Sequence, residues 1–379
     1  MKSRRMICSI LLLAAAVVLM PVTAAAMQED EDLEQWISGS GLPETFSALS
    51  ERTIALMAEL GVGEVSAAGL LSLSPKAFFR LLFHLAVDRL LHPLKSAALL
   101  TGIALVCAAA EAVRTEGAGK SVEGAVGVVG ALCCSAAVLS PAMAVIENVC
   151  AAISECSRFL LSFIPVHISV LTAGGQMASA AAGNALLFGI SQLYSELAEG
   201  IVKPLTGIFM AFSMVGAVCR EMGTGKLAGS VRKTVTWALA LASTVFVGIL
   251  TLQGTVSASM DSVSAKTVKF AVSSTVPMVG GALSEAIGSA IGYIGLLRSV
   301  TGTFGILAGA AVFLPVLTDT VLWQLSMSLA ATAAEMLGMQ PVSETARAAA
   351  DVFGILFALV LCMLLTVTVV MGMTLTIKG

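Results

Sequence analysis

The chain has 379 residues, of which 57% are apolar and only 12% are charged. A soluble domain carries about 25% charged residues, so half that charge cannot cover a surface that faces water on all sides. These totals argue against a soluble enzyme, a disordered chain and a nucleic-acid binder. They predict an all-α, polytopic membrane helix bundle, whose outer surface meets lipid.

Residues 1–26 have the pattern of a secretory signal peptide. Basic residues lie within the first five positions, Ile7–Met20 forms an apolar core, and Ala24-Ala25-Ala26 provides a small-residue cleavage site. The alternative is an uncleaved first membrane helix. We favour cleavage because the apolar core is short for a membrane span.

Two less apolar segments follow the signal. Residues 27–74 contain many acidic residues and a single base, Arg52, which predicts a small helical region outside the cytoplasm. Residues 75–95 carry charged or imidazole side chains at every fourth position, namely Lys76, Arg80, His84, Asp88 and His92. This period predicts an amphipathic helix in the headgroup plane, with an ordinary surface helix as the alternative.

Residues 96–379 form the predicted polytopic membrane domain. Bases concentrate in the short loops 114–120 and 220–233, which predicts that both loops are cytoplasmic. Two apolar runs are irregular: Phe159–Leu171 is too short to cross a bilayer, and Val276–Leu297 is interrupted by proline and glycine. We expect the second run to be a re-entrant segment, which places Lys378 in the cytoplasm.

The candidate functional residues lie in or next to these two irregular runs. Proline removes a backbone donor and glycine loosens a helix, so each run can hold a broken helix. In a bilayer, unwound backbone persists only where protein or a wet cavity satisfies it, so such segments can line a transport passage; kinked, packed helices are the alternative. The broken-segment residues are Pro165, Gly174, Gly175, Pro277, Gly280 and Gly281. Glu285 is the best candidate for a functional charge, with Arg298 as its partner.

Two GxxxG patterns predict close helix packing, within the chain or between copies in a homo-oligomer. They pair Gly288 with Gly292 and Gly305 with Gly309. Three histidines occur, but no paired histidine and carboxylate set or zinc spacing accompanies them. We therefore expect no catalytic residues, no metal site and no cofactor, and no enzyme activity.

The stretch Val247–Gly305 resembles the stage III sporulation protein AE family of endospore-forming bacteria. The residues that carry the resemblance include Leu252-Gln253-Gly254, Asp261, Lys266-Thr267-Val268-Lys269-Phe270, Val276–Gly281, Ser284-Glu285-Ala286 and Leu296-Leu297-Arg298. Phe163-Ile164-Pro165-Val166 with Gly174-Gly175 matches a second block of the family. Glu285 stands where the family usually has Asp, and Arg298 where it usually has Lys, so the charge is kept at both.

The resemblance implies a multi-pass protein of the mother-cell membrane around the forespore. There it would belong to a channel complex, or feeding tube, that resembles secretion systems. Its partners would be other proteins of the same sporulation locus and a forespore protein. We expect the chain to form or line the membrane passage. The alternatives are a scaffold that conducts nothing and anchors the other subunits, and a secondary transporter that works alone.

Overall fold

The computed structural model describes residues 37–63, 75–113, 120–204 and 280–376, and scattered helical positions between 207 and 261. Side chains are described from Ala125 onward in the helix that begins at Lys120, and from Ile294 onward in the helix that begins at Gly280. In the last helix they are described up to Gly372. The predicted signal peptide, most of the acidic residues that follow it, and Pro277 lie outside these ranges. Within the ranges the chain forms helices and turns, and no strand occurs there.

The described helices include four long ones that account for most of the residues. The described α-helices are α3 (Leu42–Ser47), α4 (Glu51–Glu59), α6 (Pro75–Ala112), α7 (Lys120–Ala173), α8 (Met177–Glu196), α11 (Gly280–Met336) and α12 (Gln340–Thr376). A π-helical turn, Leu197–Val202, follows α8. By length and composition α6, α7, α11 and α12 are each able to cross a membrane. The prediction of an all-α bundle is confirmed, with four described helices that are long and apolar enough to span a membrane.

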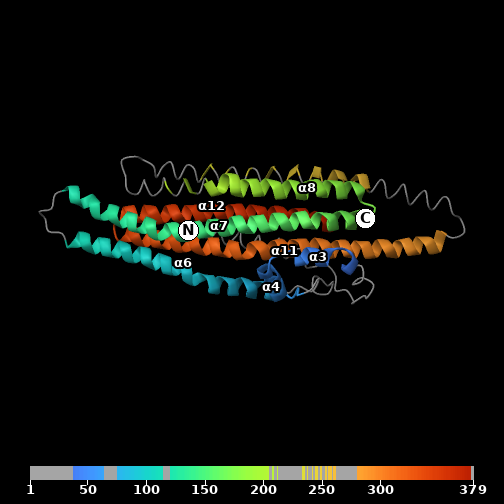
Figure 1. Cartoon of the computed structure of the whole chain (residues 1–379), viewed down its shortest axis with the longest axis horizontal. Helices are drawn as coiled ribbons and strands as arrows, with labels where there is room; N and C mark the ends of the chain where they lie inside the picture. Colours follow the sequence, from blue (N-terminus) through green and yellow to red (C-terminus); the bar gives the residue numbers. More distant parts are fainter. Residues whose placement is uncertain are drawn as a thin grey trace.

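Helix α11 lies at the centre of the bundle. Figure 1 shows α12, α7 and α11 running side by side, with α8 on one side and α6, α3 and α4 on the other. Every residue from Val300 to Leu317 is buried, on all sides of the helix. A helix that is apolar around its whole circumference belongs inside a protein or a membrane, and here other helices enclose it.

The long helices are much longer than a bilayer is thick. At 1.5 Å per residue, the 54 residues of α7 and the 57 residues of α11 extend for about 81 Å and about 85 Å. The hydrocarbon core of a bilayer is about 30 Å thick. A helix of this length that crosses a bilayer near its normal therefore continues well beyond the hydrocarbon.

Two of the predicted irregularities are wrong where the backbone is described, namely the break at Pro165 and the re-entrant segment, whereas a helix does end at Gly174 and Gly175. Helix α7 runs through Pro165 without interruption. It joins the apolar runs Val122–Ile146 and Phe159–Leu171, which a charged interval separates in the sequence. Helix α11 runs from Gly280 to Met336, so residues 280–297 are part of a long helix and not a re-entrant loop. Both stretches stay helical because a helix satisfies its backbone internally, and at Pro165 the neighbouring Phe163 and Val166 are buried in the core.

Helices α3 and α4 pack against the middle of the bundle. The Glu155 carboxylate of α7 accepts hydrogen bonds from Thr53 Oγ1 at 2.8 Å and from the Ser50 backbone at 3.2 Å. The ring of Phe46, in α3, lies 6.3 Å from that of Phe304, in α11. The described part of the predicted acidic region is therefore helical, and it is docked on the long helices.

Candidate functional site

The sequence-predicted Gly174 and Gly175 form the turn between α7 and α8. The Gly175 N–H bonds to the Thr172 carbonyl at 2.9 Å, and the Gln176 N–H bonds to the Leu171 carbonyl at 2.9 Å. Gly175 has a φ of 72°, which favours glycine. This is a Schellman turn, so α7 ends here and the chain reverses into α8.

Asp261 occupies the start of α8. One of its carboxylate oxygens accepts the N–H of Ala178 at 2.9 Å, and the other accepts the N–H of Ser179 at 2.8 Å. The first N–H groups of a helix have no partner within it, and the helix dipole favours negative charge at that end. A carboxylate distant in sequence thus caps α8, and Asp261 is buried there.

Arg298 joins α11 to the same turn. Its Nη1 atom donates a hydrogen bond to Gln176 Oε1 at 2.8 Å. Gly174 is also close to α11, since a Cβ atom at that position would lie 3.2 Å from Ile294 Cγ2. We call Gly174, Gly175, Gln176, Asp261 and Arg298 the turn cluster.

The turn cluster brings together both blocks of the family resemblance. Gly174 and Gly175 come from the first block, and Asp261 and Arg298 come from the second. It connects three stretches of chain with one acidic and one basic side chain. The Arg298 guanidinium pairs with the Gln176 amide, and the Asp261 carboxylate pairs with the first amides of α8. Among the described residues, no group of three or more His, Cys, Asp and Glu side chains is placed to hold a metal ion.

Other predicted site residues lie apart from the turn cluster. Pro165 is exposed on the outer surface of α7. Glu285 and Arg298 are 13 positions apart in one continuous helix, which separates them by about 20 Å along its axis, so the predicted pairing of Glu285 with Arg298 is wrong. Gly280, Gly281, Gly288 and Gly292 belong to α11, and their surroundings lie outside the described side chains.

Gly305 and Gly309 face α12. A Cβ atom at position 305 would lie 2.6 Å from Met371 Sδ, and one at position 309 would lie 3.1 Å from Val367 Cγ1. Small residues let helix backbones approach closely. In this chain the contact that these two glycines make is internal, between α11 and α12.

Sequence reasoning missed Gln176 as a site residue and treated Asp261 only as part of the family resemblance. Gln176 is the residue that precedes α8, and its side chain makes no capping bond to its own helix. Asp261 lies more than 80 residues from the amides that it accepts. A sequence pattern over a few residues cannot predict a contact between residues so far apart in the chain. This cap is therefore evident only in the three-dimensional structure.

Replacing Asp261 with alanine is expected to loosen the start of α8. The loss of both carboxylate bonds should cost about 1–2 kcal/mol locally, because two amide donors lose their acceptor. Hydrogen–deuterium exchange should show faster exchange at Ala178 and Ser179. Thr255→Ala is the matched control, since Thr255 is exposed and its hydroxyl donates to the Leu252 carbonyl of its own segment. Equal exchange in both variants would contradict the capping role.

A family model for stage III sporulation protein AE matches residues 62–377, which include every residue of the turn cluster. The chain belongs to this family. The family is one of sporulation stage III proteins, so the chain is a sporulation protein with several helices that can cross a membrane.

One curated relative is the stage III sporulation protein AE of Bacillus subtilis (strain 168). It is 27% identical over 155 residues, which is 41% of this chain and 39% of the relative. No solved structure matches the chain.

Proposed function

We propose that this protein is a membrane subunit of the channel complex between mother cell and forespore, and that it serves there as a closed scaffold. Family membership supports the first part, because the family resemblance implies such a complex. The second part is supported by the enclosure of α11, whose residues 300–317 are all buried. Apolar packing fills the centre of the bundle at this level, where a passage within one chain would have to run.

The aromatic cluster gives the strongest support for a closed centre. Phe304 of α11 contacts Phe159 and Phe163 of α7, with ring centroids 5.9 Å and 6.2 Å apart. Protein interiors of this kind are packed as densely as organic crystals and leave few voids larger than a water molecule. Pro165 belongs to the same stretch of α7 but faces outward.

A disulfide between α11 and α12 tests the scaffold against a conduit through the chain. A Cβ atom at position 309 would lie 4.0 Å from the Val367 Cβ, within the range of about 3.5–4.5 Å that a disulfide needs. Gly309→Cys with Val367→Cys should therefore lock the two helices together on oxidation. The measurement is late forespore gene expression in the sporulating cell that encodes the protein, before and after oxidation.

A scaffold is expected to tolerate this lock, so forespore expression should stay at the level of the two single-cysteine controls. Partner subunits should also remain associated with the locked protein when it is purified. A conduit that opens between α11 and α12 would lose forespore expression on oxidation and regain it with a reductant. That second result would overturn the scaffold proposal.

A further inference from the structure

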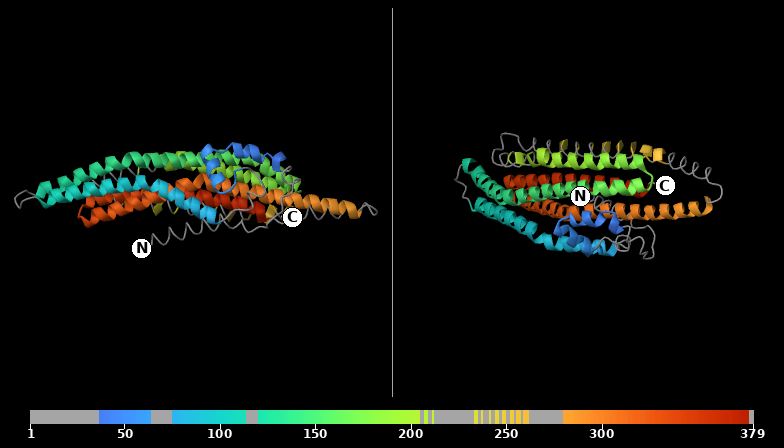
Figure 2. Two further views of the ribbon diagram at one scale, coloured as in Figure 1. Left: turned by 90° about the horizontal axis from the view of Figure 1, so that it is seen from below. Right: turned by 45° about the vertical axis from the view of Figure 1, so that its right-hand side comes forward.

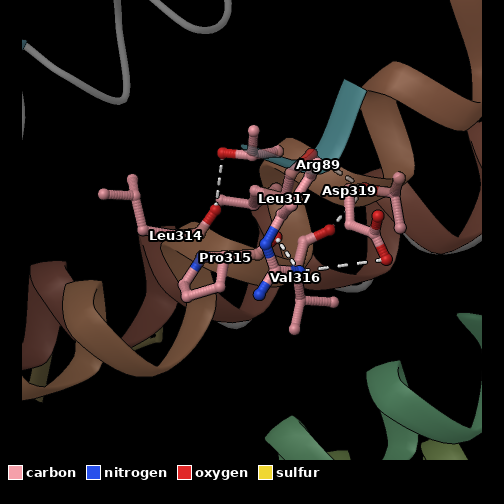
Figure 3. Close-up of polar contacts among 8 residues, drawn as sticks. Arg89, Leu314, Pro315, Val316, Leu317 and Asp319 are labelled. Atoms are coloured by element: carbon pink, nitrogen blue, oxygen red, sulfur yellow. Dashed lines mark hydrogen bonds and ion pairs between the residues drawn. The ribbon is translucent and has the colours of Figure 1, made fainter. Parts of the chain in front are cut away.

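Helices α6 and α11 cross at a charged pair inside the bundle. Arg89 of α6 lies with its Nη1 atom 4.0 Å from Asp319 Oδ2 of α11, and the two side chains are only 19% and 14% exposed. The same Nη1 atom donates a hydrogen bond of 3.3 Å to the Pro315 carbonyl (Figure 3). Arg89 therefore contacts both the side chain and the backbone of one turn of α11.

Each of the crossing helices contains a buried proline one turn from its charged residue. Pro93 follows Arg89 by four positions, and Pro315 precedes Asp319 by four. Proline has no N–H, so it leaves the carbonyl four residues earlier without its helical donor. The two carbonyls are those of Arg89 itself and of Ala311. Figure 2 shows α6 bending near the middle of its length.

Side chains supply additional donors to the turn of α11 that follows Pro315. Thr318 Oγ1 donates to the Leu314 carbonyl at 2.8 Å, and Thr320 Oγ1 donates to the carbonyls of Val316 and Leu317 at 2.9 Å and 3.0 Å. With Arg89 on Pro315, four consecutive carbonyls accept a side-chain hydrogen bond. Threonine bonds of this type often accompany bent helices, and they keep a carbonyl satisfied when its helical bond lengthens.

A third proline lies at a similar level of the bundle. Gly130 of α7 is packed against both Cys107 of α6 and Val342 of α12, which gives a common reference point along the helices. At 1.5 Å per residue, Pro141 lies about 16 Å from this point along α7, and Pro93 lies about 21 Å from it along α6. Because α6 and α7 are antiparallel, both distances run away from the tip of the α6–α7 hairpin. Helix α12 carries Gly354 about 18 Å from the same point.

We propose that this level of the bundle is a hinge, and that the Arg89–Asp319 pair is the latch that sets its angle. Gly309 and Gly305 pack against Val367 and Met371, so Pro315 lies opposite position 361 of the antiparallel α12, about 28 Å from the reference point. The three prolines and Gly354 therefore fall within a zone about 12 Å long, roughly two helical turns, in which all four long helices are weakened. One side of the hinge holds the α6–α7 hairpin and the turn between α11 and α12. The other side holds α3, α8 and the turn cluster. Helix α4 reaches the hinge, where its Arg52 is close enough to Asp319 to interact with that carboxylate electrostatically.

Distance measurements between spin labels test the hinge in the full chain. Labels at Val106→Cys and Phe188→Cys, both exposed positions, lie on opposite sides of it, in a background whose native cysteines are changed to alanine. In lipid nanodiscs, Asp319→Asn should roughly double the width of the distance distribution, because the latch is lost. The charge exchange Arg89→Asp with Asp319→Arg should restore the narrower distribution.

Glu335→Gln is the matched control. Glu335 also lies in α11 and also pairs with an arginine, Arg347, but at the α11–α12 turn and away from the hinge. It should leave the distribution unchanged. An unchanged distribution in Asp319→Asn, or an equal broadening in Glu335→Gln, would overturn the proposal. Pro315→Ala provides a second test if Asp319→Asn does not fold: it restores a helical donor and should narrow the distribution, and a broader one would count against the hinge.

Discussion

Replacing Phe304 with alanine is expected to lower the free energy of unfolding by about 3–5 kcal/mol, the range for removal of a large buried aromatic side chain. Phe304 is fully buried, and its ring contacts Phe46, Phe159 and Phe163. The substitution removes the ring that connects α3, α7 and α11 and leaves a cavity that stiff helices cannot close. Equilibrium unfolding in detergent micelles would measure the loss.

Phe83→Ala is the matched control for this prediction. Phe83 lies on α6 with 73% of its surface exposed, so the same change of side chain removes little packing. We expect its effect on unfolding to stay within about 0.5 kcal/mol. Limited proteolysis should also cut near α3 faster in Phe304→Ala than in the parent, since Phe46 loses its partner. Equal stability of the two variants would mean that the aromatic cluster is not the core of the bundle.

The fold class follows from composition, because a chain with so few charges has to hide most of its backbone in helices. The full length of α7 could also have been predicted from the sequence. The charged interval from Glu147 to Arg158 made the helix look like two separate apolar segments. Through that interval the buried residues recur at helical spacing, as Ile146, Val149, Ile153, Cys156 and Leu160. A period of three to four residues that continues across a polar stretch indicates one helix with an exposed face.

The position of Arg89 could also have been read from the sequence. The exposed stripe of α6 follows Lys76, Arg80, His84, Asp88 and His92, and Arg89 lies off that stripe among residues that face the bundle. A base on the apolar side of an amphipathic helix needs a partner, because an unpaired buried charge is costly. That partner, Asp319, lies 230 positions away, so its identity depended on the packing of α6 against α11.

The turn cluster was predictable only in part. Gly174 and Gly175 were correctly selected as a point where the chain departs from a helix, since the pair provides the backbone freedom that a Schellman turn needs. Proline was the misleading signal. Pro165 stays inside α7 because its missing N–H costs one hydrogen bond, whereas breaking the helix there would expose several backbone groups and unpack Phe163.

Replacing Gly309 with leucine is expected to destabilise the bundle by about 3 kcal/mol, at the upper end of the usual cost of overpacking. A Cβ atom at position 309 already lies 3.1 Å from Val367 Cγ1, and valine is stiff about χ1, so α12 has to move away from α11. Thermal unfolding in micelles would measure this effect. Gly102→Leu is the matched control: no atom lies within 4 Å of a Cβ there, so leucine gains helix propensity without a clash and should be neutral or slightly stabilising. If both leucines were tolerated equally, close contact between α11 and α12 could not be what holds the central helix in place.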